Sequence, residues 1–545
     1  MTSKSSPPIL IVGAGPTGLV LALRLARHGV PVRIIDQKSG PGEASRAMVV
    51  QARALEHYGQ IGLAAAMVQQ GIAIEQLHLR EGNREVTAVG IKDIGGDLSP
   101  FPFVLSFPQD DHERFLVEQL AAQGITVEWG VALKTFAETG SGVATVLVRG
   151  DDEERFEASY VCGCDGAHST VRRVLELDFA GGTYSELFYV ADVGITTAFA
   201  PDLFVNLSAQ GFVLMLPVRS RGMQRLIGIV PPDLAGREHL TFADVRASAE
   251  AAIDVQVDQV NWFSTYHVHH RVADRFRVGR SFLLGDAAHV HSPAGGQGMN
   301  TGIGDAVNLS WKLAQVVAGR IGPAVLDTYE PERIAFARTL VATTDRAFQG
   351  ITGQGWGGHL LRHRLVPMLA PILLGRKSVQ RALFRAISQI RIAYRDSALS
   401  AGQAGRLHGG DRLPWVPSAS GDNFRALDNL DWRLHVYGVP SQAMSEEATA
   451  LGLPMDSFPW NAAADRAGLH QDAMYLIRPD MHVALASMKQ DPRTLRTFAT
   501  RIGLAATLPV HAAERTGSMR GRSRRAASAR ISICTGASIW CTPGP

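Results

Sequence analysis

The chain has 545 residues, of which 46% are hydrophobic and 19% are charged, a composition typical of a globular protein with about three or four domains. These values exclude a disordered chain, and four cysteines are too few for a disulfide-built secreted protein. The formal charge of +3 is uneven, because residues 511–545 carry six Arg and one Glu, which leaves residues 1–510 at −2. The globular part therefore lacks the basic footprint of a nucleic-acid partner.

Hydropathy predicts a soluble protein of the cytoplasm without a membrane partner. No segment reaches the ~18 apolar residues of a membrane span. The run at 9–23 is interrupted by three glycines and Pro16, and it lacks the charged leader and cleavage site of a signal peptide. The run at 365–374 is short and broken by Pro367 and Pro371, so we expect a packed helix there.

The first informative element is a βαβ unit at the N-terminus. An apolar run predicts a buried strand at 8–12, and a helix and a second strand that ends at Asp36 follow. The loop between the first strand and the helix has the pattern Gly-x-Gly-x-x-Gly, formed by Gly13, Gly15 and Gly18. Such glycines permit a tight turn, the approach of a pyrophosphate and close packing of helix against strand. The unit predicts a dinucleotide site with Asp36 at the adenosine ribose.

Two later segments also combine a strand, a turn and the start of a helix. The segment 160–173 contains Asp165-Gly166, and the segment 280–302 contains Gly285-Asp286 at the end of a strand. A proline and a run of small residues follow, and we expect the next helix to begin at about Ile303. Small residues before a helix fit a backbone that lies against a flat ligand. This run continues to Gly302 and contains Gly298, Met299 and Asn300.

Together, the three motifs resemble those of the flavin-dependent aromatic hydroxylases, the family of para-hydroxybenzoate hydroxylase, phenol hydroxylase and the aromatic polyketide hydroxylases. The resemblance covers residues 8–345. It implies an α/β fold (α+β overall), with a Rossmann-like FAD-binding domain, an inserted antiparallel-sheet substrate domain, a helical segment and a C-terminal thioredoxin-like domain. It also implies FAD and NAD(P)H as cofactors. No second Rossmann unit follows, which agrees with a family in which the nicotinamide docks on the surface.

The expected domains follow from these motifs and from the alternating apolar segments between them. They are 1–180 (FAD binding, with a substrate-domain excursion near 75–105), 181–270 (substrate sheet), 271–400 (completion of the FAD-binding domain and helical segment), 401–510 (thioredoxin-like) and 511–545 (disordered basic tail). No cysteine lies between 165 and 533, which excludes a thioredoxin redox role. We expect the thioredoxin-like domain to stabilise the structure or a homodimer.

The resemblance assigns cofactor contacts to individual residues. The first motif would bind the ADP half of FAD, and Asp165-Gly166 would contact both FAD and NAD(P)H. Asp286 would contact the ribityl chain, and Gly298–Asn300 would lie along the flavin ring. Two further cofactor contacts are implied, Arg46 and Gln109.

Other reactive residues have competing interpretations. His289 and His291 flank the third motif and could act as acid and base, but we favour histidines that hold the Asp286 loop by hydrogen bonds. Cys162 and Cys164 lack the spacing of a metal-binding pair, so we interpret them as small buried strand residues and expect no metal.

The resemblance also implies the reaction. Reduced flavin would take up O₂ to form a C4a-hydroperoxide, which an electron-rich aromatic ring would attack in a dry pocket. The backbone carbonyl of Pro293, near the flavin and the substrate, is our catalytic candidate. The expected function is NAD(P)H-dependent hydroxylation of a phenolic or polyketide-like aromatic. Two alternatives stay open: an FAD-dependent dehydrogenase or reductase without oxygen insertion, and a non-enzymatic flavin-binding protein.

Overall fold

The computed structural model describes residues 7–42, 47–81, 84–196, 200–208, 211–219, 222–234, 236–237, 239–292, 296–352, 365–419 and 421–504. These residues all belong to one compact unit, Met1–Ala506. Arg46, Pro293 and the tail expected at 511–545 lie outside the described residues.

The N-terminal βαβ unit lies in a six-stranded sheet with the order β18-β19-β12-β1-β2-β8. All neighbouring pairs are parallel except β18 and β19, which are antiparallel. The first strand is fully buried, as is typical of a parallel strand covered on both faces. The strands are β1 (Ile9–Val12), β2 (Val32–Asp36), β8 (Glu128–Trp129), β12 (Val161–Gly163), β18 (Arg277–Val278) and β19 (Ser281–Leu283).

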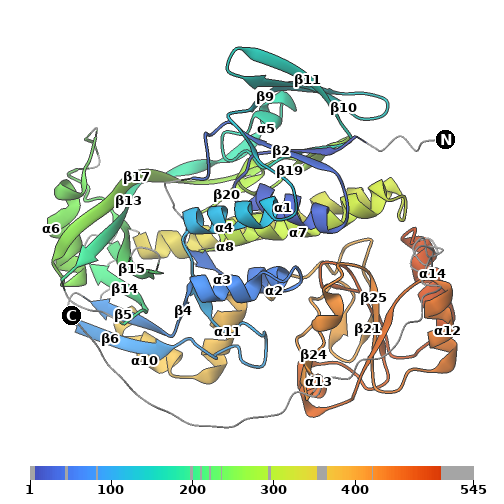
Figure 1. Cartoon of the computed structure of the whole chain (residues 1–545). Helices are drawn as coiled ribbons and strands as arrows, with labels where there is room; N and C mark the ends of the chain where they lie inside the picture. The colour runs from blue at the N-terminus through green and yellow to red at the C-terminus, as the bar shows by residue number, and fades with distance from the viewer. Residues whose placement is uncertain are drawn as a thin grey trace, which may run out of the picture. The chain divides into compact units, whose positions relative to one another are not determined.

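Two layers cover this sheet, with helices on one side and a three-stranded antiparallel sheet on the other (Figure 1). The helix α1 begins at Pro16, where proline is favoured because its missing N–H has no helical partner. It ends before Gly29, whose φ of 72° suits the residue after a helix. The helices are α1 (Pro16–Arg27), α4 (Gln109–Ala121) and α7 (Gly298–Val317), and the strands are β9 (Ala132–Glu138), β10 (Val143–Arg149) and β11 (Asp152–Ala158).

A second, eight-stranded sheet has the order β20-β17-β13-β16-β15-β14-β5-β6. Only its β14–β5 pair is parallel, and β5 and β6 come from a distant part of the chain. The helix α6 (Phe242–Ile253) packs on one face through a buried apolar cluster. The strands are β5 (Gln76–Glu81), β6 (Arg84–Gly90), β13 (Phe179–Ile195), β14 (Leu203–Ser208), β15 (Gly211–Val218), β16 (Met223–Ile229), β17 (Val257–Ala273) and β20 (His289–Val290).

Shorter elements join the two sheets. Three strands pair in the order β3-β7-β4, and two α-helices follow the first of them. These elements are β3 (Val49–Val50), β4 (Ile72–Ile74), β7 (Val104–Ser106), α2 (Ala52–Gly59), α3 (Ala64–Gln70), α5 (Thr170–Val174), α8 (Tyr329–Thr352), α10 (Val366–Leu374) and α11 (Lys377–Ile387). The helix expected at 365–374 forms as α10 and packs against the rest of the fold, although Met368 is 59% exposed and Ile372 58%. Only the side near Leu374 packs on the β4–β6 region.

The C-terminal part contains a sheet with the order β22-β21-β28-β27-β25-β26. From residue 433 its elements follow the order β-α-β-α-β-β-α, which is typical of a thioredoxin-like fold. The expected α/β fold with a thioredoxin-like C-terminal domain is therefore confirmed. The elements are β21 (Ala401–Ala404), β22 (Leu407–His408), β25 (Arg433–Tyr437), α12 (Gln442–Ala450), β26 (Met455–Phe458), α13 (Ala462–Ala467), β27 (Met474–Ile477), β28 (Val483–Ser487) and α14 (Pro492–Arg501).

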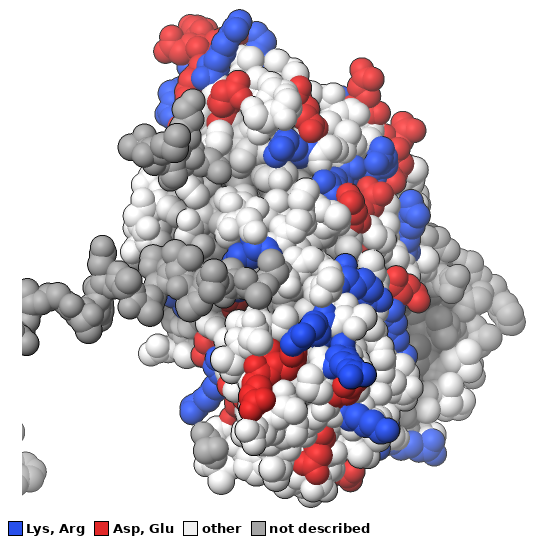
Figure 2. All heavy atoms as spheres, turned by 90° about the vertical axis from the view of Figure 1, so that its right-hand side faces the viewer, with Lys and Arg blue, Asp and Glu red and all other residues white. Residues whose placement is uncertain are grey.

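One face of the molecule shows how its surface charges are distributed. On the face seen in Figure 2, basic and acidic side chains are interspersed, and this face carries no continuous basic stripe among the residues described. Within the described ranges, no helix is both long and apolar enough to cross a membrane.

A buried charge network attaches the thioredoxin-like domain to α7 and α8. Arg478 donates to both carboxylate oxygens of Glu332 at 2.8 and 2.9 Å, and it also donates to Asp480. Lys312 of α7 donates to Glu332 at 2.8 Å, and Trp311 donates its indole N–H to Asp480 at 3.2 Å. Burial alone would raise the pKa of Glu332, but Arg478 and Lys312 hold that pKa well below its ordinary value.

Glu332→Gln should destabilise the protein at pH 7 by about 3–5 kcal/mol, because it leaves Arg478 and Lys312 buried without this counter-charge. The depressed pKa of Glu332 means that its contribution is present above the unfolded value of about 4.3 and is lost as pH falls below it. Chemical denaturation should therefore show a gap between the two proteins at pH 7 that narrows below about pH 4. Glu153→Gln, whose partner Lys134 is half exposed, should change neither the unfolding free energy at pH 7 nor its dependence on pH.

Candidate functional site

The three sequence motifs meet at one edge of the parallel sheet. The strands β1, β12 and β19 are neighbours, and each motif begins where one of them ends. The backbone N–H of Cys164 donates to Val12 at 2.7 Å, and that of Leu284 donates to Gly163 at 2.9 Å. The carboxyl ends of parallel strands are the usual place for a ligand crevice in such sheets. The motifs, far apart in sequence, therefore form one candidate site.

The glycines of the first motif have different surroundings. A Cβ atom at Gly13, where φ is +104°, would lie 2.3 Å from the carbonyl oxygen of Cys164. One at Gly18 would lie 2.0 Å from the carbonyl oxygen of Gly13. One at Gly15 would meet nothing within 4 Å. Gly13 and Gly18 are thus needed for packing, whereas Gly15 faces open space into which a ligand can approach the backbone.

Two helices direct their N-termini toward this edge without a side-chain cap. Neither Gly15, the N-cap of α1, nor Gln297, the N-cap of α7, has a side-chain cap bond, and neither first turn contains an acid. Their backbone N–H groups and helix dipoles therefore favour an anion. With the open space at Gly15, this arrangement fits the pyrophosphate of FAD.

Asp36 lies at the end of β2 and supports the glycine turn. Its carboxylate accepts hydrogen bonds from the backbone N–H of Ala14 at 2.8 Å and of Lys38 at 2.9 Å. The side chain is buried, so its orientation is fixed by these bonds. The predicted contact of Asp36 with a ribose remains a prediction.

The second motif is tied to the third by Arg172. The Arg172 guanidinium donates to the carbonyl of Ala287 at 2.9 Å and of Ala167 at 2.7 Å. Asp165 accepts from the backbone N–H of Thr170 and Val171 at the start of α5, and burial raises its pKa. Gly166 has a φ of +78°, and a Cβ atom there would meet nothing within 4 Å.

Asp305 holds the turn of the third motif. Its carboxylate accepts from the backbone N–H of Gly285 at 2.9 Å, from His289 Nε2 at 2.8 Å and from Arg333 Nε at 2.6 Å. Burial alone would raise the pKa of Asp305, but Arg333 and His289 lower it below its ordinary value. The favoured interpretation of His289, a histidine that holds the Asp286 loop, is confirmed. Asp286 itself is exposed at the centre of this turn.

The helix α7 begins at Gly298, earlier than the expected start at about Ile303. Asn300 explains the difference, because its side chain donates to the carbonyl of Gly296 at 2.8 Å and so closes the first turn. The same side chain donates to Val49 at 2.9 Å and accepts from the N–H of Gln51 at 2.8 Å. Gly298, Met299 and Asn300 therefore lie in the first turn of a helix and not in the loop before it.

Met299 and His291 are held beside this first turn. The Met299 sulfur lies 3.3 Å from His112 Nδ1, while His112 Nε2 lies 2.8 Å from the hydroxyl of Tyr58. Burial lowers the pKa of His112 to about 3 and, together with smaller effects, that of His291 to about 4. His291 Nδ1 donates to the carbonyl of Ser292 at 2.8 Å. At neutral pH His291 is therefore uncharged, which leaves Nε2 as an acceptor.

Gln109 lies at the start of α4. Its side chain donates to Glu113 at 2.8 Å, and its backbone N–H donates to the carbonyl of Ala47 at 3.0 Å. Glu113 also accepts from the backbone N–H of Gly42 at 2.8 Å. Gln109 is thus next to both ends of the undescribed segment that contains Arg46.

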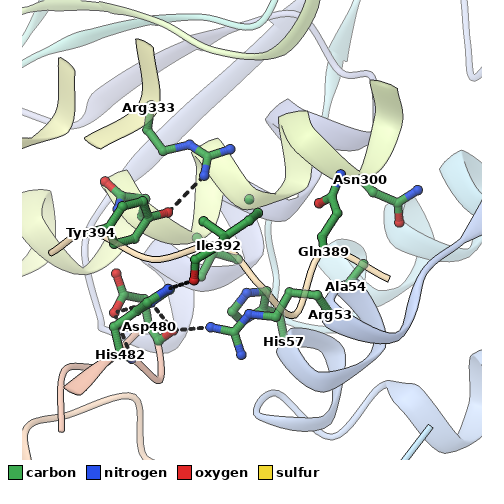
Figure 3. Close-up of a pocket in the computed structure, with 13 residues that line it drawn as sticks. Arg53, Ala54, His57, Asn300, Arg333, Gln389, Ile392, Tyr394, Asp480 and His482 are labelled. Atoms are coloured by element: carbon green, nitrogen blue, oxygen red, sulfur yellow. Dashed lines mark hydrogen bonds and ion pairs between the residues drawn. The ribbon is translucent and has the colours of Figure 1, made fainter. Parts of the chain in front are cut away.

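A small cavity lies below the first half of α7, where Asn300, Gln389, Tyr394 and His482 are among the lining residues (Figure 3). Its free space is enough for about one water molecule, far too little for a flavin. It belongs to the polar contact between α7 and the thioredoxin-like domain and not to the cofactor site.

The sequence analysis missed the side chains that hold the motifs together: Arg172, Asp305, Arg333 and His112. Asp305 had a usable signal, because it is an acid flanked by the apolar residues Ile303, Ala306 and Val307 of one helix. Arg333 and His112 have no local signal, since their side-chain partners lie far away in the sequence, and the bond of Arg172 that joins two motifs spans 115 residues to Ala287.

Gly15→Leu should weaken FAD binding at least about 100-fold, which corresponds to about 2.7 kcal/mol, because the side chain enters the open space at the helix N-terminus. The unfolding free energy of the FAD-free protein should stay close to wild type, since a φ of −76° suits any residue. Gly13→Ala is the contrast and should destabilise even the FAD-free protein, because of its clash and its φ of +104°. Equal destabilisation by the two variants would contradict this division of roles.

Asp305→Asn should cost about 3–5 kcal/mol of unfolding free energy, because Arg333 is left buried without this counter-charge. Since the Gly285 turn loses its anchor, the purified variant should also release flavin more readily on dilution, measured by flavin fluorescence. Asp327→Asn is a matched control, because its partner Arg277 binds it at the surface, where Asp327 is 73% exposed. A stable variant with wild-type flavin retention would contradict the role given to Asp305.

Comparison with known proteins shows to which family the chain belongs. Residues 7–344, more than half of the chain, match the family described as "FAD binding domain". The 6-methylpretetramide 4-monooxygenase of Streptomyces rimosus is 31% identical over 560 residues, which cover 95% of this chain and 96% of that protein. Pentachlorophenol 4-monooxygenase of Sphingobium chlorophenolicum is 32% identical over 419 residues, 74% of this chain and 75% of that protein.

A solved structure has the same fold over nearly the whole chain. The anhydrotetracycline hydroxylase OxyS of Streptomyces rimosus superimposes with a TM-score of 0.74 at 26% identity, covering 92% of this chain and 100% of that one. The resemblance inferred from the three motifs is therefore confirmed. The chain belongs to the FAD-dependent monooxygenases that share this FAD-binding domain, the group of aromatic and polyketide hydroxylases.

Proposed function

We propose that this FAD-dependent monooxygenase hydroxylates a phenolic or polyketide-derived aromatic ring, with NAD(P)H as reductant and O₂ as oxygen source. Flavin, when bound, supplies the redox and oxygen chemistry, and the chain supplies binding, orientation and exclusion of water. The relatives named above act, by their names, on a pretetramide and on a chlorinated phenol. The second of these names specifies a phenol, and both name a monooxygenase, which supports this substrate class.

Two features support the proposal, the start of α7 and an aromatic cluster on the eight-stranded sheet. Asn300 donates to Val49, and Met48 and Val49 pack against Leu216 and Val218 of β15. Because alternate strand residues share a face, Phe212 of the same strand lies on this side. Phe212, Tyr184, Phe188, Ile229, Val268 and Tyr266 form one apolar cluster. A flat aromatic substrate would thus lie between this face and the first turn of α7.

A buried ion pair stiffens this face. Arg225 donates to both oxygens of Asp192 at 2.6 and 2.8 Å, and its guanidinium lies 5.7 Å from the ring of Trp262. Asp192 and Phe188 lie on the same strand, β13, at alternate positions, so their side chains point to the same face of the sheet. The pair therefore fixes Trp262 beside the aromatic cluster, where the ring can stack on a substrate.

The cofactor roles of individual residues are part of this proposal. The ADP half of FAD would bind to Gly13, Gly15, Gly18 and Asp36. The uncapped N-terminus of α1 supports this assignment. Asp286 would reach the ribityl chain from its exposed turn. The backbone of Gly298–Asn300 would lie along the flavin ring, since the Asn300 side chain is already bonded within the protein. The roles proposed from the family resemblance are kept for Arg46, Gln109, Asp165-Gly166 and the Pro293 carbonyl.

The experiment is anaerobic mixing of the purified holoenzyme with NADPH or NADH and a panel of phenols and polyketide aromatics. The visible flavin bands should bleach faster with a true substrate than without one. Under ¹⁸O₂ the product should then carry one labelled oxygen, measured by mass spectrometry. Label from water would contradict hydroxylation by O₂, and full turnover without O₂ but with another electron acceptor would favour a dehydrogenase. Gly15→Leu, depleted of flavin, serves as the blank.

A further inference from the structure

The helix α10 presents an apolar face to solvent. Exposed fractions are 38% for Leu365, 59% for Met368, 40% for Leu369, 58% for Ile372 and 43% for Leu373. Their spacing of three and four residues places them on one side of the helix. We call these five residues the α10 face. Single exposed apolar residues are ordinary, whereas a contiguous group of this kind marks a binding surface.

The opposite side of the helix pair is firmly packed, so the α10 face is a fixed part of the fold. Leu374 and Ile387 pack against Ile74, Val89, Ile91 and Val104. Phe384 of α11 is 3% exposed and lies over Gly95, where a Cβ atom would come within 2.2 Å of its ring. Figure 1 places α10 and α11 next to each other beside β6.

The stretch of sequence that contains the α10 face is strongly basic. From residue 346 to residue 395 the sequence contains no Asp or Glu. Arg376, Lys377, Arg385 and Arg391 are exposed, and the described residues provide no ion-pair partner for them. Arg381 does pair, with Asp97. An apolar face bordered by unpaired cations is the pattern of a helix that lies in a membrane interface.

We propose that α10 and α11 dock the protein on the surface of an anionic lipid bilayer. The α10 face would enter the boundary between headgroups and acyl chains, and the neighbouring Arg376, Lys377 and Arg385 would bind lipid phosphates and carboxylates. The helix has nine residues, so it lies on the membrane and does not cross it. A second copy of the chain is a poorer occupant, because a two-fold axis would bring the same cations together.

The test is co-sedimentation of the flavin-loaded enzyme with vesicles of phosphatidylcholine alone or with added phosphatidylserine. The enzyme should sediment with the anionic vesicles, should bind the neutral ones weakly, and should dissociate as salt is raised. The double variant Met368→Ser/Ile372→Ser should bind anionic vesicles about tenfold less tightly, since two apolar contacts are lost. Val439→Ser is the matched control, because Val439 is 77% exposed on the thioredoxin-like domain, and it should bind like wild type.

Charge reversal tests the contribution of the cations to lipid binding separately from that of the α10 face. Lys377→Glu should weaken binding to anionic vesicles about fivefold or more and leave the weak neutral binding unchanged. Arg466→Glu, an exposed reversal on α13, should have no effect. Flavin content and unfolding midpoint, measured for each variant, confirm that it is folded.

Three outcomes would overturn the proposal. The first is wild-type enzyme that sediments with neither vesicle. The second is a Met368→Ser/Ile372→Ser variant that binds lipid as tightly as wild type. The third is a wild-type dimer in light scattering that this variant dissociates without any lipid binding, which would assign the α10 face to a second copy. None of these results depends on which substrate the enzyme hydroxylates.

Discussion

The carboxylate of Asp305 is the interaction on which the candidate site depends. It is completely buried, and it joins the Gly285 turn, His289 and Arg333. A buried carboxylate is costly unless its charge is compensated and its lone pairs are bonded, and here both conditions are met. The turn that exposes Asp286 is therefore fixed to α7 and α8, so the third motif keeps its place at the sheet edge beside the other two.

A second set of buried charges extends this arrangement into the thioredoxin-like domain. Arg333 donates to the hydroxyl of Tyr394 at 2.8 Å (Figure 3). The neighbouring Glu332 binds Arg478, which also binds Asp480. Arg53 of α2 donates to the backbone carbonyl of Asp480 at 2.8 Å. Removal of the domain would take Arg478 from Glu332 and the Asp480 carbonyl from Arg53, so that Glu332 would keep only Lys312 as a charged partner. These contacts support the structural role expected for this domain, while the expected homodimer remains a prediction.

The local pattern of the sequence was enough to predict the motifs but not what joins them. The first βαβ unit follows from apolar runs and glycine spacing, because turn and strand preferences act over a few residues. The apolar run at 365–374 predicted a packed helix, but such a run does not tell which side of the helix is covered. Asp305 and Arg333 are 28 residues apart, and Arg53 and Asp480 are 427 apart. Such pairs form only when the tertiary fold brings the two residues together, so they cannot be predicted from residue spacing.

The helix α7 connects these observations, because both the cofactor site and the thioredoxin-like domain act on it. Its first turn lies at the sheet edge, while Asp305, Trp311 and Lys312 further along bind the buried networks. A ligand at the first turn and a domain docked on the later turns therefore stabilise the same position of one rigid element. The thioredoxin-like domain therefore contributes to the candidate site by fixing the helix whose first turn lies beside it.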